Sequence, residues 1–431
     1  MRVSRWGRGQ FILVVLLAAS PATAGAGEPD SVAVPAATSD GSSATVVKMT
    51  WPDIVRLVDQ QPRLAAGKFQ IDVAHGGVDA ARAVPNPTLE TTGGQGLARI
   101  GDDSRGEWGL ALSVPLGWIA QRGSRIDAAE AEVDVAVAES RALRRDVLLQ
   151  LRTLFRNLAD EQARVATSEV LEAQTSALVQ TVKRRVEKGE ARPVEGTRVE
   201  IELEKVTSEL EAAGTSLSAR QAEFALWLGV PAGKMLVAVA DLDVLPVAVD
   251  RDTALAKART THPALAVARA RTRLLEAEVG TERMARVPSF SITGFTASEL
   301  DRRAYGIGLG VDVPIWNWNS GRIAQAEAKL AVGRNQAATT ALEVEATVIE
   351  AQAACRASVA TAIRQKDRVV PLSVTAAFTM ERTYQLGEAS LLEVIDARRT
   401  LLDSRRLYLS ALAQAHIDCS RLSALVGEEL P

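Results

Sequence analysis

Residues 384–415, YQLGEASLLEVIDARRTLLDSRRLYLSALAQA, place a glycine inside an otherwise helical pattern. Gly387 can adopt the positive φ that reverses a chain between two helices. Just beyond it, Glu393 and Asp396 are three residues apart, so they share one helix face. Apolar residues then recur every seven positions, as in a coiled coil, at Ile395, Leu402 and Leu409. The stretch predicts the tip of a helical hairpin with two acids beside the turn.

The chain repeats this plan with a period of about 200 residues. Four pairs of segments match in the same order: QQPRLAAGKFQIDVA (60–74) with THPALAVARARTRLL (261–275), VPNPTLETTGG (84–94) with RVPSFSITGFT (286–296), LALSVPLGWIAQRGSRIDAAEAEV (110–133) with LGVDVPIWNWNSGRIAQAEAKLAV (309–332), and KGEARPVEG (188–196) with LGEASLLEV (386–394). Four ordered matches indicate an internal duplication.

Each copy opens with a short helical segment, at 51–83 and 252–285, and Thr50 followed by Pro52 marks a helix start. Two alternating runs then follow in each copy, near 87–100 and 106–116 and near 289–298 and 305–315. In the last run, apolar residues share one face: Ile307, Leu309, Val311 and Val313. Runs of about ten residues with period two have the length of membrane-spanning β-strands. A soluble β-hairpin explains the alternation equally well.

Helix-forming sequence then runs for about 65 residues in each copy, from Gly123 to Lys188 and from Gly321 to Leu386. Each run would extend roughly 95–100 Å as a helix. Pro371 interrupts the second run and is expected to kink it. A returning helix completes each copy, with hairpin tips at Gly189 and Gly387. An apolar content of 47% with only 4% aromatic residues suits long helices packed through small side chains.

The N-terminus has the pattern of an export signal. Three arginines (Arg2, Arg5 and Arg8) precede the apolar run FILVVLLAAS and the small residues PATAGAG. Cleavage is expected after Ala24 or Ala26, which moves the formal net charge from −3 to −6 and argues against a nucleic-acid partner. The predicted layout is a signal peptide (1–26), a flexible segment (27–48), a first repeat (49–230), a linker (231–251) and a second repeat (252–428).

The remaining chemistry-bearing residues are few. Cys355 and Cys419 are the only two cysteines, and they are interpreted as buried or facing thiols in preference to a disulfide. The three histidines, His75, His262 and His416, are isolated, and no metal-ligand cluster or catalytic constellation accompanies them. The sequence therefore predicts neither an enzyme nor a bound cofactor or metal.

The stretch YQLGEASLLEVIDARRTL, with the duplicated order of helix, strands and helical hairpin over 49–428, resembles the outer-membrane efflux family, the trimeric export channels related to TolC. The stretch VPIWNWNSGRIAQAEAKL (313–330) and the lack of a lipoprotein cysteine are most similar to the heavy-metal branch. The resemblance implies a homotrimer whose protomers each give four strands to one twelve-stranded β-barrel in lipid. The long helices would continue it as an α-barrel across the periplasm of a Gram-negative envelope.

The resemblance also implies roles for individual residues. Glu393, Asp396 and, in the first repeat, Glu195 match positions that line an acidic periplasmic entrance; helix-surface acids kept for solubility are the alternative. Both hairpin tips match the region that meets a periplasmic adaptor; their residues are Lys188, Gly189, Glu190 and Ala191 in the first repeat, and Leu386, Gly387, Glu388 and Ala389 in the second. A simple turn without a partner is the alternative. Trp316 and Trp318 suit a membrane-interface belt or ordinary packing at a junction.

The function that this resemblance implies is the outer-membrane exit channel of a tripartite system. Its partners would be a periplasmic adaptor and an inner-membrane antiporter of the resistance-nodulation-division (RND) type, which would supply the energy. Heavy-metal cations are the favoured cargo, conducted passively past the acids. The alternatives are a multidrug or type I secretion channel and, from another class, a soluble periplasmic coiled-coil scaffold.

Overall fold

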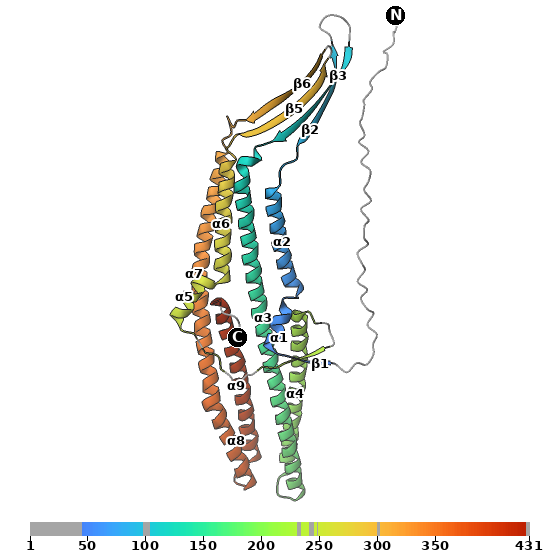
Figure 1. The fold of residues 1–431 in the computed structure, drawn as a ribbon. Coiled ribbons are helices and arrows are strands. Elements are labelled where there is room, and N and C mark those ends of the chain that lie inside the picture. The colour runs from blue at the N-terminus through green and yellow to red at the C-terminus, as the bar shows by residue number, and fades with distance from the viewer. Residues whose placement is uncertain are drawn as a thin grey trace, which may run out of the picture. The chain divides into compact units, whose positions relative to one another are not determined.

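The structure, a computed structural model, describes residues 45–97, 104–230, 234–240, 245–247, 249–299 and 302–427. The predicted signal peptide and its cleavage site lie outside these residues. A four-stranded sheet stands at one end of the long helices, and the two hairpin tips stand at the other (Figure 1). This mainly helical arrangement with a four-stranded sheet at one end agrees with the predicted fold class of the protomer.

The four-stranded sheet is antiparallel and joins the two repeats. Its strands, in spatial order, are β2 (Thr88–Leu97), β3 (Ser104–Pro115), β5 (Ser289–Glu299) and β6 (Arg302–Asp312). Strand β3 of the first repeat pairs with β5 of the second, with Leu112 opposite Gly294. Strands β2 and β6 are the two edges, so each has an unpaired side within the protomer.

One face of this sheet is apolar and exposed. Directly paired residues lie on the same face of an antiparallel sheet, so the register decides its membership. This face carries Leu89, Trp108, Leu110, Leu112, Val114, Phe290, Ile292, Ile307, Leu309 and Val311, all of them exposed. Apart from Phe295, the opposite face is small or polar, with Ser113 and Thr293 hydrogen-bonded at 3.1 Å. The predicted alternation is confirmed, although Val313 lies one residue beyond β6.

A second, two-stranded sheet was not predicted. Strand β1 (Thr45–Met49) pairs in parallel with β4 (Lys234–Ala238). The expectation of a flexible segment through residue 48 is therefore wrong at its end, and the linker 231–251 contains a strand. Leu236 and Met49 are buried in the core of the first repeat, and this burial offsets the entropy of ordering two such short strands.

Each predicted opening helix is two helices in the structure. The first repeat has α1 (Trp51–Val58) and α2 (Pro62–Arg82), and the second has α5 (Arg251–Thr261) and α6 (Pro263–Met284). The breaks fall at Gln61 and His262, which precede prolines and adopt ψ values of 140° and 128°. A proline disfavours helical ψ in the residue before it, so one helix ends and the next begins there.

The long hairpins follow. In the first repeat α3 (Trp118–Glu187) is one helix of 70 residues and α4 (Pro193–Leu228) returns along it. The second repeat has α7 (Ser320–Arg364), a π-helical turn η1 (Gln365–Val369), α8 (Val370–Gln385) and the returning α9 (Leu391–Leu425). Among the described residues, no helix combines the length and the apolar content needed to cross a membrane.

The π-helical turn holds one additional residue of the second repeat. Before it, buried positions correspond at a spacing of 197 residues: Val147 with Val344, Leu151 with Val348, and Leu158 with Cys355. After it the spacing is 198: Thr175 with Ser373, and Gly189 with Gly387. A π turn accommodates such an extra residue without changing which side faces the core. The predicted interruption at Pro371 therefore takes the form of a π-helical turn just before the proline.

The expectation of free thiols is wrong, because Cys355 on α7 and Cys419 on α9 form a disulfide with Cα atoms 4.7 Å apart. Both cysteines belong to the buried core of the second repeat. Their sequence separation of 64 residues gave no sign of proximity. The hairpin reversal at Gly387 brings the two helices together, and it places the two Cα atoms within the range that a disulfide requires.

Replacing both cysteines (Cys355→Ala/Cys419→Ala) is expected to lower the free energy of unfolding by about 4 kcal/mol, because the disulfide closes a 64-residue loop in the unfolded chain. Denaturant unfolding of the purified protein, with and without a reductant, measures the effect. The reductant should destabilise the wild type to the level of the variant and leave the variant unchanged. Two titratable thiols in unreduced, unfolded wild type would contradict the bond.

Candidate functional site at the hairpin tips

The two hairpin tips have the same backbone design. Each long helix ends in a glycine with positive φ, 77° at Gly189 and 82° at Gly387. The N–H of Gly189 donates to the Val186 carbonyl at 3.0 Å, and the N–H of Glu190 donates to the Arg185 carbonyl at 2.8 Å. The second tip repeats this pair of bonds from Gly387 and Glu388. This Schellman pattern satisfies the last helical carbonyls, which is why the sequence turns at these glycines.

Each returning helix has a glutamate at its third position. At the start of α9, the Glu393 carboxylate accepts from the Ser390 N–H at 2.7 Å and from the Ser390 hydroxyl at 2.9 Å. The Ser390 hydroxyl in turn accepts from the Glu393 N–H, which completes a capping box. In α4 the matching Glu195 accepts instead from Arg192 Nε at 3.2 Å.

The tips of the two repeats pack on each other. One buried cluster combines first-repeat residues with second-repeat residues: Leu178, Val179, Val182 and Val199 with Tyr384, Leu391, Val394 and Ile395. The Arg185 guanidinium lies over the Tyr384 ring, 4.9 Å from its centre. Burial raises the pKa of the Tyr384 hydroxyl. The site therefore belongs to both repeats and depends on their packing.

The predicted acids differ in exposure. Glu393 and Asp396 are both exposed on one side of α9, one turn apart, and neither is covered by its own protomer. The hydrogen bonds from the Ser390 backbone and hydroxyl hold the pKa of the Glu393 carboxyl below its usual range, so it is charged at neutral pH. The Glu195 side chain is 19% exposed and is turned toward Arg192. The tip of the first repeat therefore exposes less carboxylate to solvent than the tip of the second.

Ion pairs that the sequence interpretation missed join the returning helices of the two repeats. Arg399 on α9 donates through both Nε and Nη2 to the Glu202 carboxylate on α4, with Nε to Oε1 at 2.6 Å. Seven residues along both helices, Arg406 pairs with Glu209 at 2.9 Å. We call these two pairs the inter-repeat ladder. Matching seven-residue spacings of arginine and glutamate were its only signal in the sequence.

The ladder is partly shielded from solvent at its first step. The Glu202 side chain is 12% exposed, and its hydrogen bond raises the pKa of Arg399, with Glu209 and Asp396 adding to the effect. Arg398, the neighbouring residue, pairs with Glu381 on α8 at 2.9 Å and donates to the Gln174 carbonyl on α3. Helix α9 is thus held near its tip both by guanidinium contacts and by the buried apolar cluster that the two repeats share.

The other predicted site residues lie on the surface. In the two tips, Lys188, Gly189, Glu190, Leu386, Gly387 and Glu388 are exposed, and Ala191 and Ala389 are half-buried. Trp316 and Trp318 follow β6 and are 93% and 57% exposed, so they do not fill a core within the protomer. Arg286 donates to the Trp318 carbonyl at 2.9 Å. Within the described residues, no three His, Cys, Asp or Glu side chains form a group that could hold a metal ion.

Comparison with known proteins shows which protein family shares this architecture. The model of the outer membrane efflux protein family matches residues 54–230 and 254–428, which is most of the chain. The cobalt-zinc-cadmium resistance protein CzcC of Cupriavidus metallidurans is 28% identical over 372 residues, a region that covers 84% of this chain and 86% of CzcC.

Solved structures share the fold. A membrane protein from Pseudomonas aeruginosa superposes with a TM-score of 0.75 at 18% identity, covering 89% of this chain and 94% of that one. CusC gives 0.74 at 18% identity, with coverages of 90% and 94%. VceC from Vibrio cholerae gives 0.71 at 17% identity, with coverages of 88% and 97%. At these identities the likeness concerns the fold alone.

Proposed function

Because the chain belongs to the outer membrane efflux protein family, we propose that it is the exit channel of a tripartite efflux system that carries heavy-metal cations out of the cell. The observation that carries the membrane placement is the apolar, exposed face of the four-stranded sheet. Contiguous apolar surface of this kind requires lipid or a protein partner. Lipid suits strands of 10–12 residues that alternate apolar and polar side chains.

A homotrimer closes the sheet. Strands β2 and β6 are edges within the protomer and have similar lengths, 10 and 11 residues. Pairing β6 of one protomer with β2 of the next, three times over, gives a closed twelve-stranded barrel in which no edge remains unpaired in the bilayer. The exposed Trp316 and Trp318 follow β6 directly, where they would lie at the membrane–water interface.

The hairpin tips form the periplasmic entrance in this proposal. Three-fold symmetry turns the exposed Glu393 and Asp396 into two rings of three carboxylates, which attract cations and repel anions. Glu195 contributes less, because Arg192 compensates its charge. The entrance opens when α9 moves away from α4, and the inter-repeat ladder resists that movement.

The cargo proposal follows from CzcC, whose name records resistance to cobalt, zinc and cadmium. The channel conducts these cations passively, and an inner-membrane RND-type antiporter supplies the energy. A periplasmic adaptor connects the two by docking on both tips, at Lys188–Ala191 and Leu386–Ala389. Exposed glycines there allow the close backbone approach that such docking needs.

The proposal predicts a metal-specific phenotype. A strain that keeps the adaptor and pump genes but lacks this channel should become sensitive to zinc, cobalt and cadmium, and a plasmid copy should restore tolerance. Growth inhibition and cell-associated metal, measured by mass spectrometry, report the effect, while outer-membrane fractionation confirms that the protein is present. Restored tolerance to drugs without any change for metals would indicate a multidrug channel. A folded protein that fractionates without membrane would indicate a soluble scaffold.

A further inference from the structure

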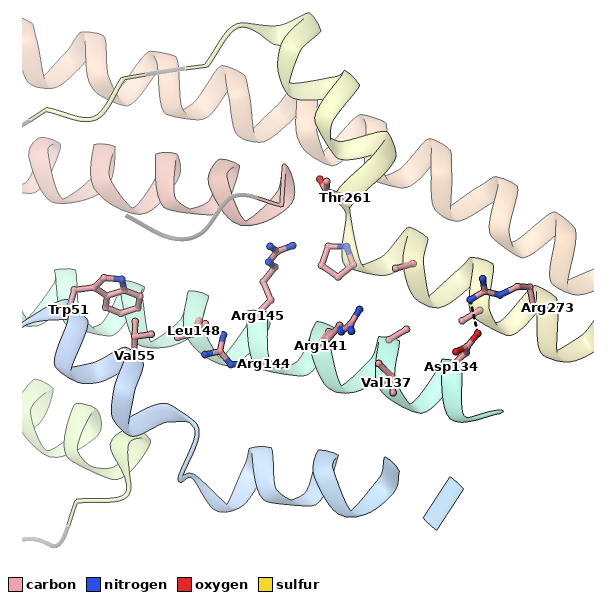
Figure 2. A pocket seen from close by; sticks show the side chains of 14 residues that line it. Trp51, Val55, Asp134, Val137, Arg141, Arg144, Arg145, Leu148, Thr261 and Arg273 are labelled. Carbon is pink, nitrogen blue, oxygen red and sulfur yellow. Dashed lines mark ion pairs between the residues drawn. The ribbon is translucent and has the colours of Figure 1, made fainter. Parts of the chain in front are cut away.

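A cavity of about 680 Å³ lies along α3, beside α1 and the start of α6 (Figure 2). Its apolar lining includes Trp51, Val55 and Leu148, together with Pro263 at the turn between α5 and α6. Four arginines complete it: Arg141, Arg144, Arg145 and Arg273. A concave space of this volume with an apolar wall and a few convergent polar groups has the dimensions of a small-molecule site.

The positive charge in this cavity is only half compensated. Arg144 is paired with Asp59 at 2.8 Å, and Arg273 is paired with Asp134 at 3.1 Å. No salt bridge within the described residues joins Arg141 or Arg145 to an acid. Arg141 and Arg145 are four residues apart, so their guanidinium groups extend from one side of α3 toward the cavity (Figure 2).

Neighbouring titratable groups offset this excess only in part. Asp146 is exposed, adjoins Arg145 in sequence and makes no salt bridge with it; burial raises the pKa of the Asp146 carboxyl, and the charge of Arg145 opposes that rise. Burial, with a further contribution from Arg145, lowers the pKa of His262. That histidine is therefore mostly neutral at neutral pH, and its Nδ1 accepts from the Ala264 N–H at 3.1 Å.

The internal duplication shows that helix packing does not require these arginines. At the spacing of 197 residues that relates α3 to α7, Arg141 corresponds to Ala338, Arg144 to Ala341 and Arg145 to Leu342. These three positions are therefore uncharged in the second repeat, where the same helix face carries Arg334 and Glu345, each in an ion pair with the preceding helices. Since the two helices otherwise match at their buried positions, the cationic cluster is a separate property of the first repeat.

We propose that this cavity binds a small soluble oxyanion that carries an apolar group, such as an aromatic phosphate or carboxylate. Arg141 and Arg145 bind the oxyanion, because guanidinium groups match phosphate and carboxylate geometry in bidentate hydrogen bonds. The apolar part packs against Trp51, Val55 and Leu148. Arg144 and Arg273 keep their own carboxylate partners and add long-range attraction.

The position of the cavity favours a soluble ligand over a lipid. Arg141 lies 23 residues along α3 from Trp118, or about 35 Å of helix, so the cavity is remote from the four-stranded sheet. If that sheet lies in the outer membrane, as proposed above, a lipid headgroup does not reach Arg141. The ligand therefore reaches the cavity from the periplasm.

Isothermal titration of the purified, assembled protein with phenyl phosphate tests the proposal. One ligand is expected to bind per protomer, and inorganic phosphate and phenol should each bind at least about tenfold more weakly, because each lacks one half of the recognised chemistry. Arg141→Ala/Arg145→Ala should weaken phenyl phosphate binding by at least about tenfold. Arg141→Lys/Arg145→Lys keeps the charge without the guanidinium fork and should give an intermediate affinity.

The matched control is Arg125→Ala/Arg322→Ala, which removes the same charge from exposed arginines of α3 and α7 outside the cavity and should bind as the wild type does. Circular dichroism and size-exclusion chromatography establish that each variant is folded and assembled. No binding to the wild type, or equal loss in both double alanine variants, would overturn the proposal. Competition by added anionic phospholipid would instead assign the cavity to lipid and overturn the soluble ligand.

Discussion

Neutralising Glu393 and Asp396 together is expected to lower the ratio of cation to anion permeability by roughly an order of magnitude. The variant Glu393→Gln/Asp396→Asn removes six carboxylates from the entrance of a trimer and changes no side-chain volume appreciably. Glutamine can replace glutamate in a capping box, so α9 keeps its start at Ser390. Single-channel recording in planar bilayers under a salt gradient gives the ratio through the reversal potential.

The control for this experiment is Glu343→Gln/Glu350→Gln. These two glutamates are exposed on α7, seven residues apart, and about 55 Å of helix separates Glu350 from the tip. Their removal should leave the permeability ratio unchanged. If both double variants lower the ratio equally, the selectivity comes from the summed charge of the α-barrel. An unchanged ratio in the tip variant would mean that neither acid sets the selectivity, so that Glu393 only caps α9 and Asp396 is an ordinary solvated surface residue.

Reversing one charge of the inter-repeat ladder is expected to open the channel. In Arg399→Glu, two carboxylates face each other across α9 and α4 where a bidentate ion pair stood, and like charges at such a contact cost several kcal/mol. Because Glu202 is largely buried, solvent relieves little of that repulsion. The tip of α9 should therefore separate from the first repeat, and single-channel conductance should rise above that of the wild type.

The double variant Arg399→Glu/Glu202→Arg restores an ion pair with the charges exchanged, and it should return conductance to the wild-type level. A second control, Arg334→Glu, makes the same reversal at the Arg334–Glu276 pair of α7 and α6, which is remote from the tip and should not alter conductance. The exchanged pair has the same net charge as the wild type, so a conductance that stays high in it would contradict the ladder as the contact that resists opening.

Most of the features of the fold and of the candidate site that depend on neighbouring residues were predicted correctly from the sequence. Gly189 and Gly387 adopt positive φ as expected, since a helix of L-residues rarely ends in that conformation without glycine. The four strands lie close to their predicted ranges because alternation records which side chains share a face. Because the chain is duplicated, each of these features was predicted independently in both repeats. The acids at the second tip are exposed, but their role as an entrance ring stays a prediction.

Some predictions failed because a local signal was overlooked, and others because the answer depended on distant partners. The breaks before Pro62 and Pro263 carried a local signal that was overlooked, because the residue before each proline is extended and a new helix begins at the proline. Strands β1 and β4 had no comparable signal, since 185 residues separate Met49 from Lys234 and each strand is stable only through the other and the core beneath. The Glu195 prediction missed that Arg192 binds the carboxylate.

The duplicated plan, the reversals at the two glycines and the alternation of the strands could all be predicted from the amino-acid sequence, because each follows from the conformational preferences of neighbouring residues. The Cys355–Cys419 bond, the inter-repeat ladder and the cationic cavity on α3 became evident only in the folded chain. The disulfide joins residues 64 apart, each ladder pair joins residues 197 apart, and the cavity is lined from several different helices. Helix rotation and axial register fix such contacts, and both are set by the packing of the whole core.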